Sequence, residues 1–356
     1  MNSLLEKRHC RRILVGMSGG LDSTYTAWRL KRLGYEVGGA VLRMTDDSET
    51  QSAFRAAEQI GVPIYEVDCR EAFAQYVEME FAEAYQNGRT PNPCVTCNRY
   101  VKVAALCRFA SDNGYDHVAT GHYAQIVLDD CTERWFVRKA SAIRKDQSYV
   151  LWQLTQEQLS MLITPLAYAE KADIRQQMTG LGLEAASAKE SQDICFVPNG
   201  DYAAYIENRY GRFPKGDFLN TNGLRIGTHN GIIRYTVGQR KGLGISSPEP
   251  LYVKSISKAS NSVILSSEAE LYQDFAEVGR LVYQKLQPQC RGAELSALVK
   301  IRYAALPQEV CVQWVDEENI IVRFSKPARA LTPGQSAVFY DSTSGGTDIL
   351  FGGILA

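Results

Sequence analysis

The stretch Gly16-Met17-Ser18-Gly19-Gly20-Leu21-Asp22-Ser23 decides the fold of this chain. It follows the apolar run 13–15 and precedes a segment with helical character, 24–32, which predicts a strand, a glycine-rich turn and a helix. Glycines let the backbone approach a ligand closely, and a helix N-terminus offers unpaired N–H groups that suit phosphate. The sequence therefore predicts an anion-binding turn, and its simpler alternative is a glycine turn capped by Asp22 or Ser23.

The side chains of this loop indicate which kind of anion it binds. Ser18 and Ser23 add hydroxyl donors, and Asp22 suits a site that also holds Mg²⁺, since hard cations take carboxylate oxygens. The Gly-Lys-Ser/Thr ending of P-loop kinases and GTPases is missing. The loop instead resembles the Ser-Gly-Gly-x-Asp-Ser loop of the PP-loop ATP pyrophosphatases, which break ATP between its α and β phosphates and adenylate a substrate.

Length and composition restrict the class of protein. The 356 residues predict two or three domains, and 45% apolar residues are enough for full-sized cores. We expect no membrane span, because no run of about 18 apolar residues occurs, and no secretory signal at residues 1–12. Nine cysteines at irregular spacing favour reduced thiols and a cytoplasmic location. A net charge of −1 means that any nucleic-acid binding depends on local basic groups.

The first part of the chain alternates strand and helix patterns. Strands are predicted at 36–42, 64–68 and 117–120, and helices at 51–60, 71–86 and 102–111. This alternation predicts a parallel sheet with helices on both faces. Ligands bind such sheets at the C-terminal ends of the strands, where the glycine loop, Leu42 and Gly121-His122 fall.

The pattern changes near residues 197–200. Short β-like segments are predicted first at 223–227 and 232–237, and then at 295–301, 309–314, 320–324 and 336–340. Several short strands separated by turn signals predict a small barrel in the C-terminal part.

Three cysteines lie in polar settings. Cys94 and Cys97 fall in the segment 90–98, where two prolines predict a loop and Asn98 is expected to cap the next helix, lowering the pKa of a nearby thiol. Cys195 lies between a polar stretch and a proline. A lone C-x-x-C is half a zinc site, a redox dithiol or a coincidence, and the residues alone leave these open. Six cysteines remain, and most of them are expected to be buried and inert: Cys10, Cys69, Cys107, Cys131, Cys290 and Cys311.

Over essentially its whole length the chain resembles the bacterial tRNA-specific 2-thiouridylases. The resemblance rests on motifs in the family's order: Gly16–Ser23, Gly88–Asn98, Ala119–Ala124, Lys145–Tyr149, Ser191–Pro198, Tyr235–Gly244, Ile301–Tyr303 and Leu331–Val338. It implies an α/β fold with a PP-loop domain of the adenine nucleotide alpha-hydrolase-like kind at 1–200. A small central domain at 201–272 and a C-terminal β-barrel at 273–356 follow, both contacting tRNA.

The resemblance also implies the reaction, in which sulfur replaces the C2 oxygen of the wobble uridine, position 34. ATP and Mg²⁺ are held by Gly16–Ser23, with Leu42 and Gly121 beside the adenosine. Cys97 matches the nucleophile and Cys195 the persulfide carrier, and the two form a transient disulfide. The target base meets Asn92, Pro93 and Cys94. Further tRNA contacts are implied at His122, Lys145, Asp146, Gln147, Arg302, Tyr303 and Gln335.

The implied partners are tRNAs for Glu, Gln and Lys and a protein that donates persulfide sulfur. Two positions depart from the pattern, because many relatives have Met at the position of Leu42 and some have Asp at that of Cys94. Two groups of basic residues fit an RNA site, although such groups are often only solvated faces: Arg138, Lys139, Arg144 and Lys145, and then Arg234, Arg240 and Lys241.

Three alternatives remain open. One is another PP-loop enzyme, such as a tRNA cytidine thiolase or an amidotransferase-type synthetase. Another is a non-catalytic RNA-binding module that holds zinc or a cluster. The last concerns the mechanism, because Cys94, Cys97 and Cys195 are three thiolates that would suit a four-iron–four-sulfur cluster with one open iron.

Overall fold

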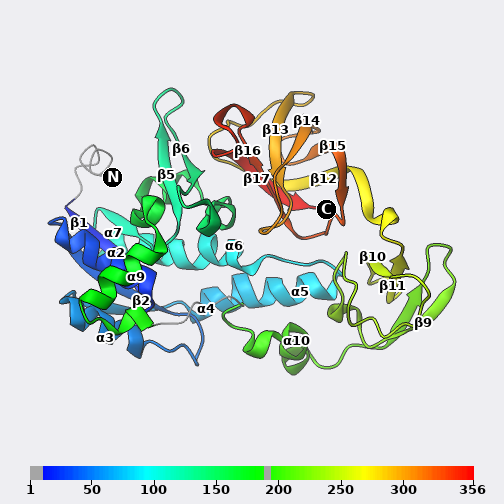
Figure 1. Cartoon of the computed structure of the whole chain (residues 1–356), viewed down its shortest axis with the longest axis horizontal. Coiled ribbons are helices and arrows are strands. Elements are labelled where there is room, and N and C mark those ends of the chain that lie inside the picture. Colours follow the sequence, from blue (N-terminus) through cyan, green and yellow to red (C-terminus); the bar gives the residue numbers. More distant parts are fainter. Residues whose placement is uncertain (1–10, 188–193) are drawn as a thin grey trace. The chain divides into compact units, whose positions relative to one another are not determined.

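A computed structural model describes residues 11–187 and 194–356, so Cys10 and the residues 191–193 of the predicted motif Ser191–Pro198 lie outside the described residues. The chain forms two compact units (Figure 1). The first comprises residues up to 77, the segment that runs from 94 to 192, and 347–350. The second comprises 78–93, 193–346 and 351–356. Each unit is described by itself.

The first unit is built on a five-stranded sheet in the order β3-β2-β1-β4-β7. Its strands are β1 (Arg12–Gly16), β2 (Glu36–Arg43), β3 (Ile64–Asp68), β4 (His117–Ala119) and β7 (Leu162–Ile163). All neighbouring pairs are parallel, which confirms the predicted sheet. Gly16 is in register with Ala40 and Val15 with Ala119, so β1, β2 and β4 end at one edge.

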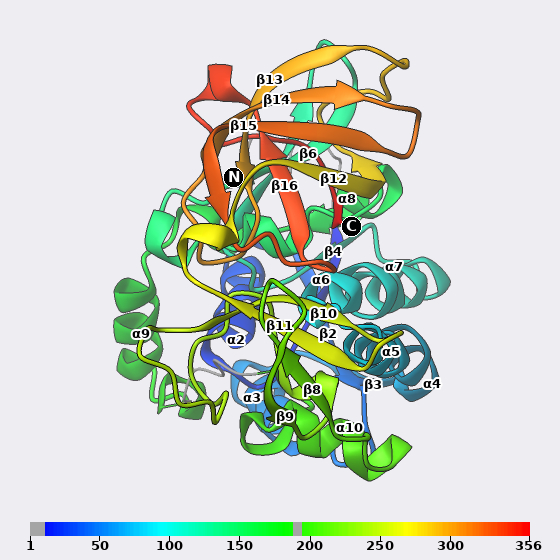
Figure 2. The same ribbon diagram turned by 90° about the vertical axis from the view of Figure 1, so that its right-hand side faces the viewer.

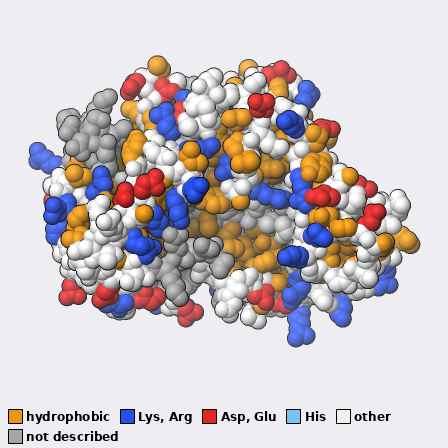
Figure 3. Space-filling view, in the orientation of Figure 1, with side chains coloured by type: hydrophobic (Ala, Val, Ile, Leu, Met, Phe, Trp, Pro, Cys, Tyr) orange, Lys and Arg blue, Asp and Glu red, His pale blue; other side chains and the backbone are white. Residues whose placement is uncertain are grey.

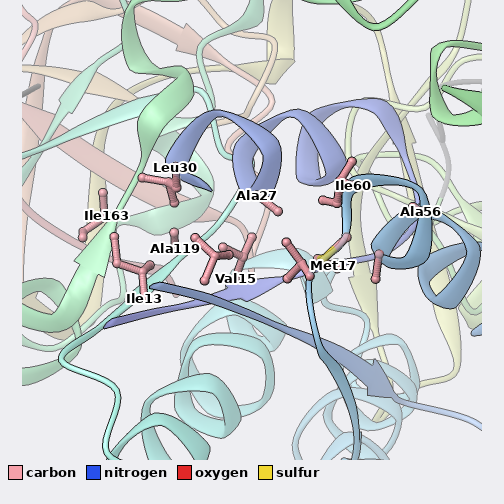
Figure 4. Close-up of a cluster of buried hydrophobic side chains, with 12 residues drawn as sticks. Ile13, Val15, Met17, Ala27, Leu30, Ala56, Ile60, Ala119 and Ile163 are labelled. Atoms are coloured by element: carbon pink, nitrogen blue, oxygen red, sulfur yellow. The ribbon is translucent and has the colours of Figure 1, made fainter. Parts of the chain in front are cut away.

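Helices cover both faces of this sheet. They are α2 (Leu21–Arg32), α3 (Gln51–Ile60), α4 (Arg70–Phe73), α6 (Pro93–Cys97), α7 (Val103–Asp112), α8 (Gln156–Met161) and α9 (Lys171–Gly180). On one face Ile13 and Val15 pack with Ala27 and Leu30 of α2 in a buried cluster that α3 completes (Figure 4). On the other face α7 comes close enough that a Cβ on Gly16 would meet Leu106 at 3.0 Å. A hairpin, β5 (Ala124–Asp129) and β6 (Arg134–Lys139), follows β4 directly.

Two predictions need correction, one of a helix and one of a loop. The predicted helix 71–86 is α4, a π-helical turn at 74–79 and α5 (Glu80–Gln86). The predicted loop at 90–98 was wrong over 93–98, since α6 begins at Pro93 and a second π-helical turn, 98–102, leads into α7. Proline is favoured at the first helical position, where its missing N–H costs nothing, so it starts this helix. Asn98 therefore lies inside a continuous helical segment and caps nothing.

The second unit holds α10 (Tyr202–Tyr210), a four-stranded sheet and a closed barrel. The sheet has the order β10-β11-β8-β9, with β8 (Gly216–Leu219), β9 (Arg225–His229), β10 (Tyr252–Ser257) and β11 (Ser262–Ser266). The predicted strand 232–237 was wrong, because 232–234 forms a 3₁₀ turn whose Ile232 and Ile233 are buried. Both isoleucines point into the core, so their apolar pattern did not require a strand.

The barrel confirms the predicted β architecture of the C-terminal part (Figure 2). Its six strands run in the order β12-β15-β14-β13-β16-β17. They are β12 (Tyr272–Tyr283), β13 (Glu294–Lys300), β14 (Gln308–Trp314), β15 (Ile320–Arg329), β16 (Ser336–Tyr340) and β17 (Ile349–Leu355). Closure pairs every strand and leaves no exposed edge.

Candidate functional site

The glycine loop joins β1 to α2 and is held by its own hydroxyl groups. The Ser18 N–H donates to Ser23 Oγ at 3.1 Å, and the Ser23 and Thr24 hydroxyls donate to the Gly20 carbonyl at 3.2 and 2.9 Å. Gly19 has φ +76°, and a Cβ there would lie 2.5 Å from the Ser52 backbone. The loop therefore needs glycine at this position.

The helix that follows begins three residues earlier than predicted, at Leu21, so Asp22 and Ser23 lie in its first turn. Gly20 is the N-cap, and within the described residues no side chain caps it. The N-terminus of α2 therefore has no side-chain cap among these residues, and its first N–H groups and positive dipole end suit a phosphate.

Two side chains that the sequence did not single out hold Asp22. Tyr123 Oη donates to Asp22 Oδ1 at 2.8 Å, and Lys171 Nζ lies 3.0 Å from Asp22 Oδ2. The side chains of Lys171 and Asp22 are only 17% and 29% exposed, and the Lys171 ammonium also lies 5.9 Å from the Tyr123 ring centre. No short motif marks this set, because Lys171 starts α9, 149 residues after Asp22.

The predicted adenosine residues lie at the same sheet edge. Gly121 follows β4, and a Cβ on it would meet the Asp22 carbonyl carbon at 3.0 Å and the Ser23 nitrogen at 3.1 Å. Met17 is buried, its N–H donating to the Ala40 carbonyl at 2.8 Å, and partly buried Leu42 follows two residues later in β2. The structure thus brings Gly121 against the loop and places Leu42 on the adjoining strand.

Cys94 and Cys97 both lie on α6, where Cys94 is exposed and Cys97 is only 9% exposed. The next residue, Asn98, is buried, and its Nδ2 donates to the Val150 carbonyl at 3.1 Å. This bond fixes the end of α6 against the segment that follows residues 145–147. Cys97 thus occupies a fixed position in the first unit.

Cys69 is a further thiol near Cys97. It is buried at the end of β3, and its Sγ lies 3.6 Å from the Val67 carbonyl. Burial, the Asp68 carboxylate and Cys97 raise the pKa of the Cys69 thiol to about 11. A protonated thiol is a poor nucleophile, so we expect Cys69 to be inert. Its burial was expected, but the expectation that most of the other cysteines are buried was wrong: of those described, Cys107 and Cys311 are only partly buried, and Cys131 and Cys290 are exposed, because polar or turn surroundings leave them at the surface.

Cys195 belongs to the second unit and is exposed. Its neighbour Phe196 packs edge-on against Phe81 at 5.3 Å and Tyr205 at 5.4 Å between ring centres. These contacts anchor the chain next to Cys195 and leave the thiol on the surface. Cys97 and Cys195 lie in different units, and each is placed only within its own.

The predicted tRNA-contact segment 145–147 lies in the first unit. Lys145 is exposed, whereas the Asp146 carboxylate accepts hydrogen bonds from the Ala140 N–H at 3.0 Å and the Ser148 hydroxyl at 2.7 Å. Gln147 and Tyr123 form two mutual bonds, in which the Tyr123 N–H donates to Gln147 Oε1 at 3.0 Å and the Gln147 N–H to the Tyr123 carbonyl at 2.8 Å. Asp146 and Gln147 therefore shape the loop that presents Lys145.

His122 is buried, with Nδ1 2.9 Å from the Thr120 hydroxyl. Burial and the Lys102 charge lower its pKa to about 3, so the imidazole is neutral near pH 7. Any contact that it makes with RNA is therefore a hydrogen bond rather than an ion pair.

The remaining predicted contacts lie in the second unit. Tyr303 is 47% exposed, and Arg302 donates to the Ala330 carbonyl and the Thr332 hydroxyl at 2.5 and 2.6 Å. Gln335 Nε2 donates to the Thr90 carbonyl at 2.8 Å and lies 3.3 Å from the Pro91 carbonyl. Gln335 thus fastens the backbone just before Asn92 and Pro93.

Two further properties of the structure are the distribution of its charged side chains and that of its possible metal ligands. On the face shown in Figure 3, Lys and Arg side chains are interspersed with Asp and Glu. Of the predicted basic residues, Arg138 is paired with Asp348 and Arg234 with Glu207. In the ranges 11–187 and 194–356, no three His, Cys, Asp or Glu side chains are grouped to hold a metal ion, and no helix is long and apolar enough to cross a membrane.

A parallel sheet whose glycine loop opens onto an uncapped helix N-terminus defines the first unit as a nucleotide-binding α/β domain of the PP-loop kind. Comparison with family models agrees. Residues 11–199 match the tRNA methyl transferase HUP domain, 204–267 the tRNA methyl transferase PRC-barrel domain, and 276–355 the aminomethyltransferase beta-barrel domain.

Curated relatives specify the family. The chain is 39% identical to tRNA-specific 2-thiouridylase MnmA 1 of Caldanaerobacter subterraneus subsp. tengcongensis, covering 96% of both chains. It is 37% identical to the MnmA of Clostridium acetobutylicum over 96% of this chain and 98% of that one. The MnmA of Syntrophotalea carbinolica is 40% identical, with 94% and 97% covered. The chain belongs to the tRNA-specific 2-thiouridylase family.

Proposed function

We propose that this protein is a tRNA 2-thiouridylase that adenylates the C2 oxygen of the wobble uridine with ATP and replaces that oxygen with sulfur. The products are 2-thiouridine, AMP and pyrophosphate. The observation that carries the proposal is the open N-terminus of α2 beside Asp22, in a chain that belongs to this family over nearly its whole length. The uridine C2 carbonyl is a poor electrophile, and adenylation makes AMP its leaving group.

We assign ATP binding to the loop Gly16–Ser23. Its backbone N–H groups and hydroxyls receive the pyrophosphate, and Leu42 and Gly121 flank the adenosine. Asp22 fits Mg²⁺, because its carboxylate is partly exposed at the helix N-terminus and each oxygen has a lone pair beyond the one used by Tyr123 or Lys171. When bound, Mg²⁺ neutralises charge on the phosphates.

Sulfur transfer uses Cys195 and Cys97. The outer sulfur of a persulfide on Cys195 attacks C2, and the bond from C2 to the AMP oxygen breaks. The Cys97 thiolate then attacks Sγ of Cys195, so the sulfur–sulfur bond breaks, the sulfur stays on C2, and a Cys97–Cys195 disulfide forms. An external dithiol reduces the disulfide, and a sulfur-donor protein reloads Cys195. In a second route the Cys97 thiolate attacks the outer sulfur of the persulfide, so the sulfur–sulfur bond breaks and Cys195 leaves as a thiolate. The new persulfide on Cys97 then attacks C2 as AMP leaves, and the Cys195 thiolate attacks Sγ of Cys97 to give the same disulfide and leave the sulfur on C2.

The wobble uridine must be turned out of its base stack, because its C2 oxygen lies next to the ribose and is shielded in the stack. We assign Asn92, Pro93 and Cys94 to the target base. We assign further tRNA contacts to His122, Lys145, Asp146, Gln147, Arg302, Tyr303 and Gln335. We place the functional domains at 1–200, 201–272 and 273–356, the substrates among tRNAs for Glu, Gln and Lys, and the enzyme in the cytoplasm.

The experiment incubates the purified protein anaerobically with ATP, Mg²⁺, unmodified tRNA and a persulfide donor. We expect AMP and 2-thiouridine in equal amounts, and ADP as the product would contradict the assignment. Cys97→Ser and Cys195→Ser should each abolish thiolation, whereas the matched variant Cys107→Ser should retain it, because burial raises the pKa of that thiol to about 11.

The same preparation tests whether Cys94, Cys97 and Cys195 hold a four-iron–four-sulfur cluster. We favour the persulfide route, so the colourless protein should thiolate fully. A brown protein with about four irons and four sulfides, and loss of colour and activity in Cys94→Ala, would replace that route with the cluster.

A further inference from the structure

Tyr123 joins two parts of the proposed active site. The residue is only 2% exposed, and its hydroxyl donates to Asp22 Oδ1 at 2.8 Å. Asp22 Oδ2 is held by Lys171 at 3.0 Å. With both oxygens engaged, the orientation of the carboxylate depends on where the Tyr123 ring lies.

The backbone of Tyr123 is tied to the proposed RNA segment. Its N–H donates to Gln147 Oε1 at 3.0 Å, and its carbonyl accepts from the Gln147 N–H at 2.8 Å. A pair of opposed bonds fixes Gln147 to Tyr123 in position and direction. A ligand that contacts the amide of Gln147 would meet Nε2, since Oε1 is the anchored atom.

The segment around Gln147 is itself braced. Asp146 Oδ1 accepts from the Ala140 N–H at 3.0 Å, and Asp146 Oδ2 accepts from the Ser148 hydroxyl at 2.7 Å. A braced segment moves as a unit, so a displacement produced at Lys145 or Gln147 reaches Tyr123 through its two backbone bonds.

The ATP loop is packed as closely on the other side. Gly121, two residues before Tyr123, lies so near α2 that a Cβ would stand 3.0 Å from the Asp22 carbonyl carbon. The same Cβ would stand 3.1 Å from the Asp22 Cβ and from the Ser23 nitrogen. The short chain 121–123 therefore carries two direct contacts to Asp22, one through the backbone of Gly121 and one through the hydroxyl of Tyr123.

We propose that Tyr123 is a positioning residue that couples RNA binding at 145–147 to ATP binding at Asp22. RNA on Lys145 and Gln147 fixes the Tyr123 backbone, and the hydroxyl then fixes Asp22 in the orientation that MgATP requires. The consequence is that tRNA strengthens ATP binding, so the nucleotide is held best when the RNA substrate is present. This inference rests on the proposed function, since it takes the segment 145–147 to contact tRNA.

The test measures the affinity of Mg²⁺ with α,β-methylene ATP, which resists cleavage between the α and β phosphates, with and without saturating unmodified tRNA. For the unaltered protein we expect tRNA to tighten nucleotide binding by about fivefold or more. Tyr123→Phe keeps the ring and removes only the hydroxyl, so the tRNA effect should fall to nearly none. Reciprocity requires that the nucleotide tighten tRNA binding by the same factor, and that this effect is lost too.

Two further variants separate coupling from general damage. Tyr168→Phe removes a hydroxyl that donates to Gln125 Oε1 at 2.9 Å in the same unit, and it should leave the tRNA effect intact. Gln147→Ala should reduce the tRNA effect, and combining it with Tyr123→Phe should cause no further loss, because both lie on one path.

The inference is overturned if Tyr123→Phe keeps the full tRNA effect, or weakens nucleotide binding equally with and without tRNA. It is also overturned if the unaltered protein thiolates tRNA but shows no coupling. Absence of 2-thiouridine with the unaltered protein would instead refute the proposed function itself.

Discussion

The Lys171 ammonium lies 3.0 Å from the Asp22 carboxylate, at the open N-terminus of α2. Asp22 is part of the glycine loop, whereas Lys171 begins α9 much later in the chain. A largely buried cation beside an anion-binding site adds to the attraction of the helix dipole for phosphate. Lys171 is therefore placed to meet the pyrophosphate end of ATP.

Lys171→Met should weaken the binding of MgATP and of pyrophosphate roughly ten- to a hundredfold, since a hydrogen bond to a charged group contributes about 1.5–3 kcal/mol. AMP lacks the pyrophosphate, so its affinity should change little. Titration calorimetry with the three ligands measures this. The matched control is Lys285→Met, which removes a similarly buried 2.8 Å ion pair to Asp341 in the other unit and should leave all three affinities unchanged. An equal loss for AMP would show that Lys171 only supports the fold.

Gly121→Ala should lower ATP affinity and thiolation more than tenfold. The added Cβ would stand 3.0–3.1 Å from backbone atoms of Asp22 and Ser23, which cannot move without shifting the first turn of α2. Gly180→Ala is the control, because this glycine ends a helix and a Cβ there would meet nothing within 4 Å outside the adjoining backbone of its own helix. Nucleotide binding and circular dichroism should be measured on both variants, and normal ATP affinity in Gly121→Ala would contradict the close approach.

His122 should make stability depend on pH. Its pKa is lowered to about 3 in the folded protein and is about 6.5 when unfolded, so the unfolded chain binds more protons between these values. The contribution is complete above pH 6.5 and is lost as the pH falls toward 3. At pH 5 the loss is about 2 kcal/mol. Urea unfolding of the unaltered protein and His122→Gln at pH 7 and pH 5 measures it: the variant should lose less between the two pH values, and parallel losses would show that His122 is not buried neutral.

Lys145 and His122 should contribute differently to RNA binding. Lys145 is exposed and charged, so Lys145→Ala should reduce the dependence of tRNA affinity on salt by about one counterion. His122 is neutral, so His122→Gln should leave that dependence unchanged. Fluorescence titrations of tRNA at several salt concentrations measure both slopes, and equal changes in the two variants would contradict the neutral state of His122.

The cysteines should react with alkylating reagents in a fixed order. Cys94 and Cys195 are exposed, whereas burial raises the pKa of Cys69 and Cys107 to about 11. Iodoacetamide at pH 8 should therefore modify Cys94 and Cys195 well before the other two, because only thiolates react. Mass spectrometry over time follows each site. Early modification of Cys69 would show that its thiol is open to solvent.

The local parts of this structure were predictable from sequence. The apolar run before Gly16, the periodicity of 51–60 and the alternation in 309–314 each indicate an element that the structure contains. The errors came where a second reading of the same residues was physically possible. Pro93 starts a helix as readily as it interrupts one, and Ile232 and Ile233 are buried without forming a strand.

The part of the site that could not be predicted is the set of contacts to Asp22. Tyr123 lies in a motif that was recognised, but its role depends on a hydrogen bond across 101 residues. Lys171 is one of many lysines, and only the packing of α9 brings it to the loop. Long-range contacts of this kind leave no local pattern of propensity or periodicity.

The most direct test of the proposed chemistry follows the oxygen atom that leaves the uridine. A tRNA carrying oxygen-18 at C2 of the wobble uridine is incubated with the protein, ATP, Mg²⁺ and a persulfide donor, and the products are separated for mass spectrometry. If the C2 oxygen is adenylated, each 2-thiouridine formed leaves one oxygen-18 in the phosphate of AMP. Oxygen-18 released to water, or found in pyrophosphate or ADP, would contradict adenylation at this oxygen.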